Sequence, residues 1–156
     1  MTARVLVALR VAATPARAFE AFTAEIAAWW KPNALFHFTP RSPGAPSFEP
    51  FEGGRFLETL PGGKVFEAGR VLVWAPGKRL VFTWRCAWFE PGATTTVEVT
   101  FTAMGDETRV SVEHAGWETI PAENAARHGF PLSHFLQREA EWWQVLLAEL
   151  RGRIAD

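Results

Sequence analysis

Residues 133–154 read SHFLQREAEWWQVLLAELRGRI, and this stretch decides the fold. Its apolar side chains recur every three or four residues, which is the spacing of one face of an α-helix, and most charged and amide side chains avoid that face. A helix is therefore predicted from about Ser133, which can cap it, to about Ile154. Its apolar face consists of Phe135, Trp142, Trp143, Leu146, Leu147, Leu150 and Ile154.

A set of alternating segments predicts the sheet against which this helix packs. The clearest is 79–88, where every second side chain is apolar and the turn at 91–92 follows. Further strands are predicted at 4–11, 55–60, 64–74, 94–104 and 108–115. The connections are short and contain glycine or proline, as is typical of antiparallel neighbours.

Two short helices are predicted between the first strand and the others. Thr14 and Pro15 form an N-cap followed by proline, the helix breaks near Thr23, and its second part ends at Pro32. Residues 32–50 contain five prolines and predict a long loop, whose phenylalanines indicate that it covers part of the protein. A further helical turn is predicted at 121–127.

This order of elements predicts one α+β domain over residues 1–156. Only the terminal helix is long enough to cover the apolar face of a bent sheet, so a strongly curved antiparallel sheet of about six to seven strands is expected to wrap around it. The chain has 156 residues, 48% of them hydrophobic and 21% charged, which is the composition of an ordinary globular core.

Composition also excludes several classes of protein. Sixteen Lys and Arg against 17 Asp and Glu provide no basic surface for nucleic acid. No segment approaches the roughly 18 consecutive apolar residues of a membrane span, and the first residues lack the pattern of a signal peptide. A cytoplasmic protein is expected, and both a monomer and a homodimer remain open.

The sequence lacks motifs for metal, cofactor or covalent chemistry. Its four histidines do not have the paired spacing of metal ligands. Cys86 is the only cysteine, and its place among apolar residues of a strand is typical of an inert buried thiol. We therefore predict no metal and no cofactor, and a binding protein is favoured over an enzyme.

The aromatic content indicates a lined cavity. The chain has 8 Trp and 13 Phe but no Tyr, which is a large apolar surface with few polar groups. We predict that a cavity between the sheet and the terminal helix binds a small apolar or amphipathic molecule. Its predicted lining is Phe82, Trp84, Trp88, Trp143 and Leu147, and the alternative for each of them is ordinary core packing.

Three polar residues are predicted to approach the same cavity. His114 shares a strand face with Val110 and Val112, so it is either a satisfied core histidine or a hydrogen-bonding group for a ligand. Glu58 and Glu67 also share the parity of apolar neighbours, and carboxylates in such a place permit acid–base chemistry. The alternatives are that they lie in water at strand ends, or that a bulge at Gly69 reverses the parity.

Motifs along nearly the whole chain resemble the START-like (SRPBCC, helix-grip) superfamily, in its heat-shock-protein-90 ATPase activator homologue branch. The similar motifs are the alanine-rich first helix ending at Trp29-Trp30, Gly53-Gly54-Arg55-Phe56, the segments 69–76, 79–84 and 108–117, and the terminal Trp143 with Leu147 and Leu150. The family often has Gly-Trp where this chain has Trp142-Trp143, so one more bulky ring enters that region.

The resemblance implies a helix-grip fold that holds an apolar or amphipathic small molecule between sheet and helix. Two alternatives stay open. One is an enzyme of cyclase, hydrolase or lyase type that uses His114 with Glu58 or Glu67. The other is an interaction domain that assists a chaperone.

Overall fold

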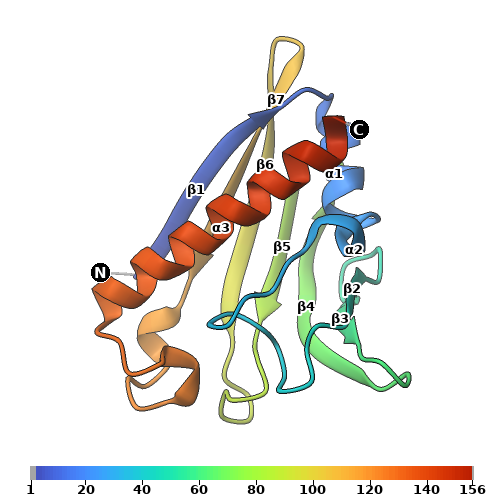
Figure 1. Cartoon of the computed structure of the whole chain (residues 1–156). Coiled ribbons are helices and arrows are strands. Elements are labelled where there is room, and N and C mark those ends of the chain that lie inside the picture. The colour runs from blue at the N-terminus through green and yellow to red at the C-terminus, as the bar shows by residue number, and fades with distance from the viewer. Residues whose placement is uncertain (1–2, 156) are drawn as a thin grey trace.

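Helix α3 (Leu132–Ala155) lies across the concave face of a curved seven-stranded sheet in the computed structural model, which describes residues 3–155 (Figure 1). The strands are all antiparallel and follow the order β1-β7-β6-β5-β4-β3-β2. Their bounds are β1 Arg4–Val11, β2 Ala45–Phe48, β3 Arg55–Thr59, β4 Val65–Ala75, β5 Arg79–Trp84, β6 Thr95–Met104 and β7 Glu107–Ala115. The predicted α+β helix-grip architecture is confirmed.

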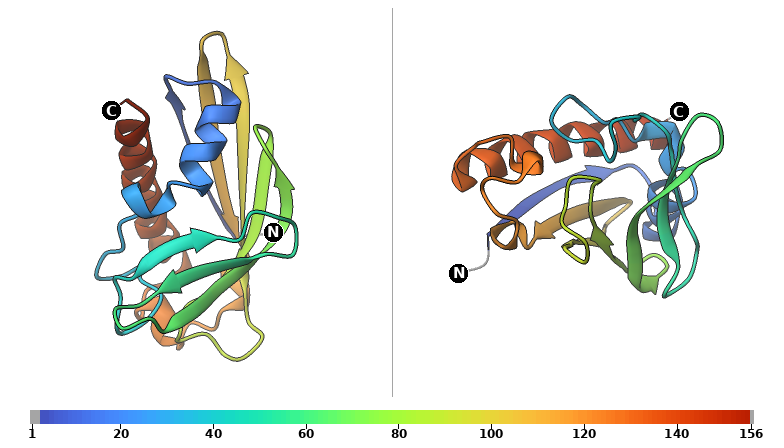
Figure 2. Two further views of the ribbon diagram at one scale, coloured as in Figure 1. Left: turned by 90° about the vertical axis from the view of Figure 1, so that its right-hand side faces the viewer. Right: turned by 90° about the horizontal axis from the view of Figure 1, so that it is seen from below.

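The two predicted short helices are present after β1. Helix α1 (Pro15–Thr23) begins as predicted, with the Thr14 hydroxyl accepting a hydrogen bond from the Arg17 backbone N–H at 3.2 Å. Helix α2 (Ile26–Trp29) follows the break at Thr23. Viewed from below, α3 forms one layer and the curled sheet the other (Figure 2).

The sheet bends where β4 changes register with both of its neighbours. Phe56 of β3 lies opposite Gly69, but the next residue of β3 lies opposite Glu67, so Ala68 is an extra residue in β4. Strand β5 passes so close that a β-carbon at Gly69 would lie 1.7 Å from the Thr83 carbonyl oxygen. Only glycine fits this contact, and of the alternatives left open for Glu67 the structure shows the bulge, with Ala68 beside Gly69 as the extra residue.

The prediction of a loop over all of 32–50 is wrong at its end, because Ala45–Phe48 forms the edge strand β2. A proline is tolerated in an edge strand, which explains why Pro46 did not prevent pairing. The rest of the segment is irregular but well packed. Phe36 and Phe38 are both buried and stack on Trp142 and Trp30, with ring centroids 5.1 and 5.9 Å apart.

Three further boundaries differ from the prediction. Strand β5 ends at Trp84 and not at Trp88, because the Ala87 N–H donates to the Phe38 carbonyl instead of continuing the ladder with β6. The helical turn predicted at 121–127 is the 3₁₀ turn η2 (Ala125–Arg127), and a second 3₁₀ turn that was not predicted, η1 (Trp117–Thr119), precedes it. Helix α3 begins at Leu132, so Ser133 lies in its first turn and does not cap it.

None of the helices in residues 3–155 is long and apolar enough to cross a membrane.

An ion-pair group fastens the two short helices to α3. The Glu25 carboxylate accepts hydrogen bonds from the Arg17 guanidinium and, at 2.9 Å, from Arg153 Nε of α3. The hydrogen bonds from Arg17, followed by those from Arg153, lower the pKa of Glu25 from 4.5 to about 2. Because the folded pKa lies below the unfolded value, the group stabilises the fold above about pH 4.5, and this stabilisation is lost as the pH falls towards 2.

We expect Glu25→Gln to lower the melting temperature at pH 7 by about 1–3 °C, the scale of a partly exposed ion pair. The difference from the wild type should shrink between about pH 4.5 and pH 2, as measured by circular dichroism melts. Glu52→Gln, at an exposed residue outside this group, is the control and should change little. A difference that stayed constant down to pH 2 would contradict the role assigned to Glu25.

Candidate functional site

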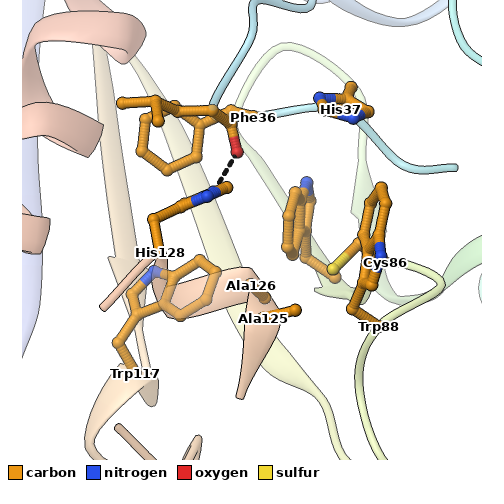
Figure 3. Close-up of a pocket in the computed structure, with 10 residues that line it drawn as sticks. Phe36, His37, Cys86, Trp88, Trp117, Ala125, Ala126 and His128 are labelled. Carbon is orange, nitrogen blue, oxygen red and sulfur yellow. Dashed lines mark hydrogen bonds between the residues drawn. The ribbon is translucent and has the colours of Figure 1, made fainter. Parts of the chain in front are cut away.

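A cavity of about 240 Å³ opens at one end of the helix grip, the region between α3 and the concave face of the sheet. It lies between the loop at 35–37, the end of β5 with the turn that follows it, and the η1–η2 segment (Figure 3). Trp117 and His128 form one side, and Cys86 and Trp88 form the other (Figure 3). The lining residues are Leu35, Phe36, His37, Trp84, Cys86, Trp88, Trp117, Ala125, Ala126 and His128.

Aromatic rings make up most of this wall and hold one another in place. Trp84 and Trp117 pack with ring centroids 5.5 Å apart, and the His37 ring stands edge-on to Trp88 at 5.1 Å. The indole N–H of Trp84 is buried and has no hydrogen-bond partner. A buried donor without a partner is costly, and this nitrogen is closed off inside the packed wall.

Two histidines of the wall are anchored to backbone carbonyls. His37 Nδ1 lies 3.0 Å from the Asn33 carbonyl oxygen, and His128 Nε2 lies 2.6 Å from that of Leu35. A carbonyl only accepts, so each of these nitrogens carries the proton. The second bond joins the loop at 35–37 to His128, the residue that follows η2, on the side of the cavity that Trp117 also forms (Figure 3). Neither histidine was predicted to be a site residue, since their positions lie outside the periodic segments.

Arg127 holds the η1–η2 segment from inside. Its guanidinium is buried over the Phe135 ring, 5.5 Å from the ring centroid. It donates to the carbonyl oxygens of Ile120 and Phe130 at 3.2 and 2.9 Å. These bonds connect both ends of the segment, so the side of the cavity that carries His128 has a defined shape.

The space predicted as the cavity, between the middle of the sheet and α3, is filled by rings. Trp30 occupies it, with ring centroids 5.4 Å from Trp142, 5.7 Å from Trp143 and 5.9 Å from Phe56. The additional ring at Trp142 contributes to this filling. The open volume is therefore found at the end of the grip and not at its centre.

The structure accordingly separates the residues predicted to line the cavity. Trp84 and Trp88 do line it. Phe82, Trp143 and Leu147 are in the closed core, each 1% exposed or less, and His114 is also fully buried. One reason is the ring of Trp30, which packs on Trp143 of the helix and Phe56 of the sheet and so fills the space between them.

His114 is the centre of a buried polar cluster. Its Nδ1 lies 2.9 Å from Glu139 Oε1, and its Nε2 lies 2.7 Å from the Thr95 hydroxyl. Trp143 donates its indole N–H to His114 Nδ1 at 3.2 Å, and Trp117 donates to Glu139 Oε1 at 2.8 Å. His114 and Glu139 are both fully buried, so the cluster ties β7 and η1 to α3 inside the core.

The hydrogen bonds determine how many protons this cluster holds. The Thr95 hydroxyl donates to the Trp84 carbonyl, so it accepts from His114 Nε2, which carries one proton. Because Nδ1 accepts from the Trp143 N–H, the proton in the contact between Nδ1 and Glu139 lies on Glu139 Oε1. The pair is therefore neutral overall, which suits a fully buried place.

Glu139 is the residue of the buried cluster that the sequence analysis missed. It stands four residues after Phe135 and four before Trp143, so it interrupts the apolar face of α3. An acid at such a position is rare without a buried partner, and this was the available signal. Its second oxygen, Oε2, is buried without a hydrogen-bond partner.

The two carboxylates predicted to work with His114 lie elsewhere. Glu58 is buried on the inner face, as its parity indicated, but it accepts hydrogen bonds from the Ser42 hydroxyl at 2.8 Å and from the Gly44 N–H at 3.1 Å. Glu67 is 39% exposed and pairs with Arg70 at 3.0 Å, because the extra residue in β4 turns it outward. Neither of them lines the cavity.

Chemistry at Cys86 is limited by its surroundings. Burial raises the pKa of its thiol to about 11, so the nucleophilic thiolate is scarce near neutral pH. Residues 3–155 contain no group of three or more His, Cys, Asp or Glu placed to hold a metal ion.

We expect Cys86 to react slowly with a thiol reagent such as dithionitrobenzoate. At pH 8 its thiolate fraction should be roughly 100-fold below that of an unfolded cysteine, and burial slows the reaction further. Measured by absorbance, the reaction should be at least about 100-fold faster in denaturant. Equal rates in the two states would show that the thiol is accessible and activated.

We expect His114 and Glu139 to act as one unit in stability. His114→Phe and Glu139→Leu should each cost about 2–4 kcal/mol in urea unfolding, because each leaves buried partners without hydrogen bonds. The double variant should fall short of the sum by at least about 1 kcal/mol. The control Glu141→Leu, on the exposed side of α3, should change the free energy by less than about 0.5 kcal/mol. Additive costs would contradict a single network.

The chain is similar to known proteins both in sequence and in structure. Residues 12–152 match the model of the family described as Activator of Hsp90 ATPase homolog 1-like protein. A comparison with curated proteins found no match.

Several solved structures are similar to this chain. An anthrahydroquinone-γ-pyrone synthase, Txn09, solved with a bound molecule termed SUM, is 33% identical, covers 71% of this chain and 75% of its own, and has a TM-score of 0.50. MLL2253 of Mesorhizobium loti is 22% identical, with 96% and 94% of the chains covered and a TM-score of 0.66. A dimeric Aha1 of Colwellia psychrerythraea is 16% identical, with 97% and 95% covered and a TM-score of 0.66.

The match to the family model extends from the end of β1 almost to the end of α3, and so includes both the cavity and the buried cluster. The chain belongs to the Activator of Hsp90 ATPase homolog 1-like family.

Proposed function

We propose that this protein binds a small aromatic molecule of about two fused rings in the cavity at the end of the helix grip. The observation that carries the proposal is the cavity itself, a space of about 240 Å³ between aromatic rings. The proposed function is still the binding of an apolar or amphipathic small molecule, as predicted. The proposed binding site lies at the end of the helix grip and not at its centre.

The size of the cavity selects the size of the ligand. An apolar protein cavity of about 150 Å³ holds benzene. A volume of about 240 Å³ is 1.6 times larger, which corresponds to a second fused ring. The cavity opens to the surface, so substituents on such a ligand can extend outwards.

The residues of the cavity wall favour a flat, apolar ligand. Phe36, Trp84, Trp88 and Trp117 offer ring faces and edges, and aromatic rings pack on one another in offset or edge-on arrangements. A planar aromatic ligand would pack against these ring faces and edges.

A second candidate function is that of an enzyme of cyclase, hydrolase or lyase type. The relative that favours it is Txn09, a synthase by name and solved with a bound small molecule. The predicted pairing of His114 with Glu58 or Glu67 does not support this candidate, since the partner of His114 is Glu139. The imidazoles of His37 and His128, which do reach the cavity, are better placed for acid–base chemistry. Conversion of a bound aromatic compound, followed by mass spectrometry, would favour the enzyme over the binding protein.

The third possibility, assistance to a chaperone through the surface, has less support. The exposed large apolar side chains of residues 3–155 are five, and they are distributed over four segments of the chain. They are Leu6 on β1, Phe51 in a turn, Val65 and Leu72 on β4, and Val145 on α3. A docking surface for a protein would be expected to gather such side chains into one patch.

We expect naphthalene to bind in the cavity and to shift the indole N–H signals of Trp84, Trp88 and Trp117 in a ¹H–¹⁵N NMR titration. The indole signal of Trp74, which packs on Phe19 away from the cavity, should stay in place. Trp→Phe variants assign the signals.

A matched pair of variants tests the location. Ala125 lines the cavity and is exposed, whereas Ala122 is equally exposed but does not line it. Ala125→Phe should fill the opening and weaken naphthalene binding by about tenfold or more, and Ala122→Phe should leave it unchanged. Shifts spread over all the indoles, or equal effects of the two variants, would contradict the proposed site.

A further inference from the structure

We propose that the ligand of this cavity carries an aromatic hydroxyl group, which donates a hydrogen bond to a bare ring nitrogen of His37 or His128. The inference rests on the proposed binding of an aromatic molecule and adds the chemical class of that molecule. It is carried by the positions of the two imidazoles and by the bonds that their other nitrogens make.

His37 offers its Nε2 to the cavity as an acceptor. Its Nδ1 is the donor to the Asn33 carbonyl oxygen at 3.0 Å, so in the neutral ring Nε2 carries a lone pair. The ring is held in its orientation by this bond, within its own loop, and by the edge-on contact with Trp88. A fixed tautomer makes Nε2 a ready acceptor for an O–H group.

In His128 the two ring nitrogens have the opposite roles, because Nε2 and not Nδ1 makes the hydrogen bond to the backbone. Nε2 donates to the Leu35 carbonyl oxygen at 2.6 Å, which leaves Nδ1 as the acceptor of the neutral ring. The backbone of His128 has φ = 54°, and it is the one non-glycine residue with positive φ in residues 3–155. Such a conformation is unfavourable for most side chains and is often found at functional positions.

The remaining wall offers few competing acceptors. None of the ten lining residues is an aspartate or a glutamate. The Cys86 thiol stays protonated near neutral pH because burial raises its pKa to about 11, and a thiol is a weak acceptor. Side-chain acceptors for a ligand are therefore concentrated on the two imidazoles, and a hydroxyl group on an aromatic ring is the donor that fits a cavity of this size and polarity.

Three probes of nearly equal shape test this inference. 2-Naphthol has a donor and an acceptor, 2-methoxynaphthalene keeps only the acceptor oxygen, and naphthalene has neither. We expect the wild-type protein to bind 2-naphthol about tenfold more tightly than either of the other two, the scale of one hydrogen bond, in calorimetric titrations at about pH 8, where an ordinary imidazole is neutral.

Variants of the two histidines test which side chains accept the hydrogen bond from the ligand. The double variant His37→Phe with His128→Gly removes both imidazole acceptors; it keeps an aromatic ring at position 37, and glycine tolerates the positive φ at position 128 without adding a side-chain acceptor. We expect it to bind the three probes with affinities within about threefold of one another. His134→Phe is the control, because His134 packs on Phe130 and does not line the cavity, and it should keep the tenfold preference.

The possible outcomes separate this inference from the proposed function. Equal binding of all three probes to the wild-type protein would overturn the hydroxyl inference and leave the aromatic cavity intact. Absence of binding by all three would overturn both. A preference for 2-naphthol that survives in a folded double variant would remove His37 and His128 as the acceptors and overturn the inference as stated.

Discussion

The apolar face of α3 has to be buried, and the concave side of the sheet is the surface that buries it. Trp143 is at the centre of this contact: it is fully buried, its ring packs on Trp30, and its N–H donates to His114 of β7. An indole that buries its ring and satisfies its N–H at the same time fixes both the depth and the rotation of the helix. The sheet must also curl, as it does at Gly69, because a flat sheet would not reach around the helix.

This packing explains why the open volume lies at the end of the grip. Trp30, Phe38, Phe56, Trp142 and Trp143 fill the space that would otherwise be a central chamber. At the end near Trp84 and Trp117 the cavity is lined mainly by residues of loops and turns. Loops supply polar side chains and free backbone carbonyls, so the wall there contains histidines as well as aromatic rings.

The buried cluster of His114 and Glu139 lies directly behind that wall. Trp84 and Trp117 pack on the His114 ring, with centroids 5.4 and 5.2 Å apart, and both of them also line the cavity. Trp117 in addition donates to Glu139. The cluster therefore positions two rings of the cavity wall while being closed to solvent itself. Its role in the described structure is to orient the wall, and the groups that meet a ligand are those of the loops.

The sequence by itself determined the periodic part of this protein: the long helix, most strands and the Thr14 cap. These follow from local rules, because alternation, helical spacing and turn residues act over a few neighbours. Only the tertiary structure decided which side chains share the cavity. The 35–37 loop and the η2 turn are more than 85 residues apart and meet through one bond, His128 to Leu35. The partner of His114 was likewise decided by where α3 lies on β7, and parity along a single strand contains no information about that distance.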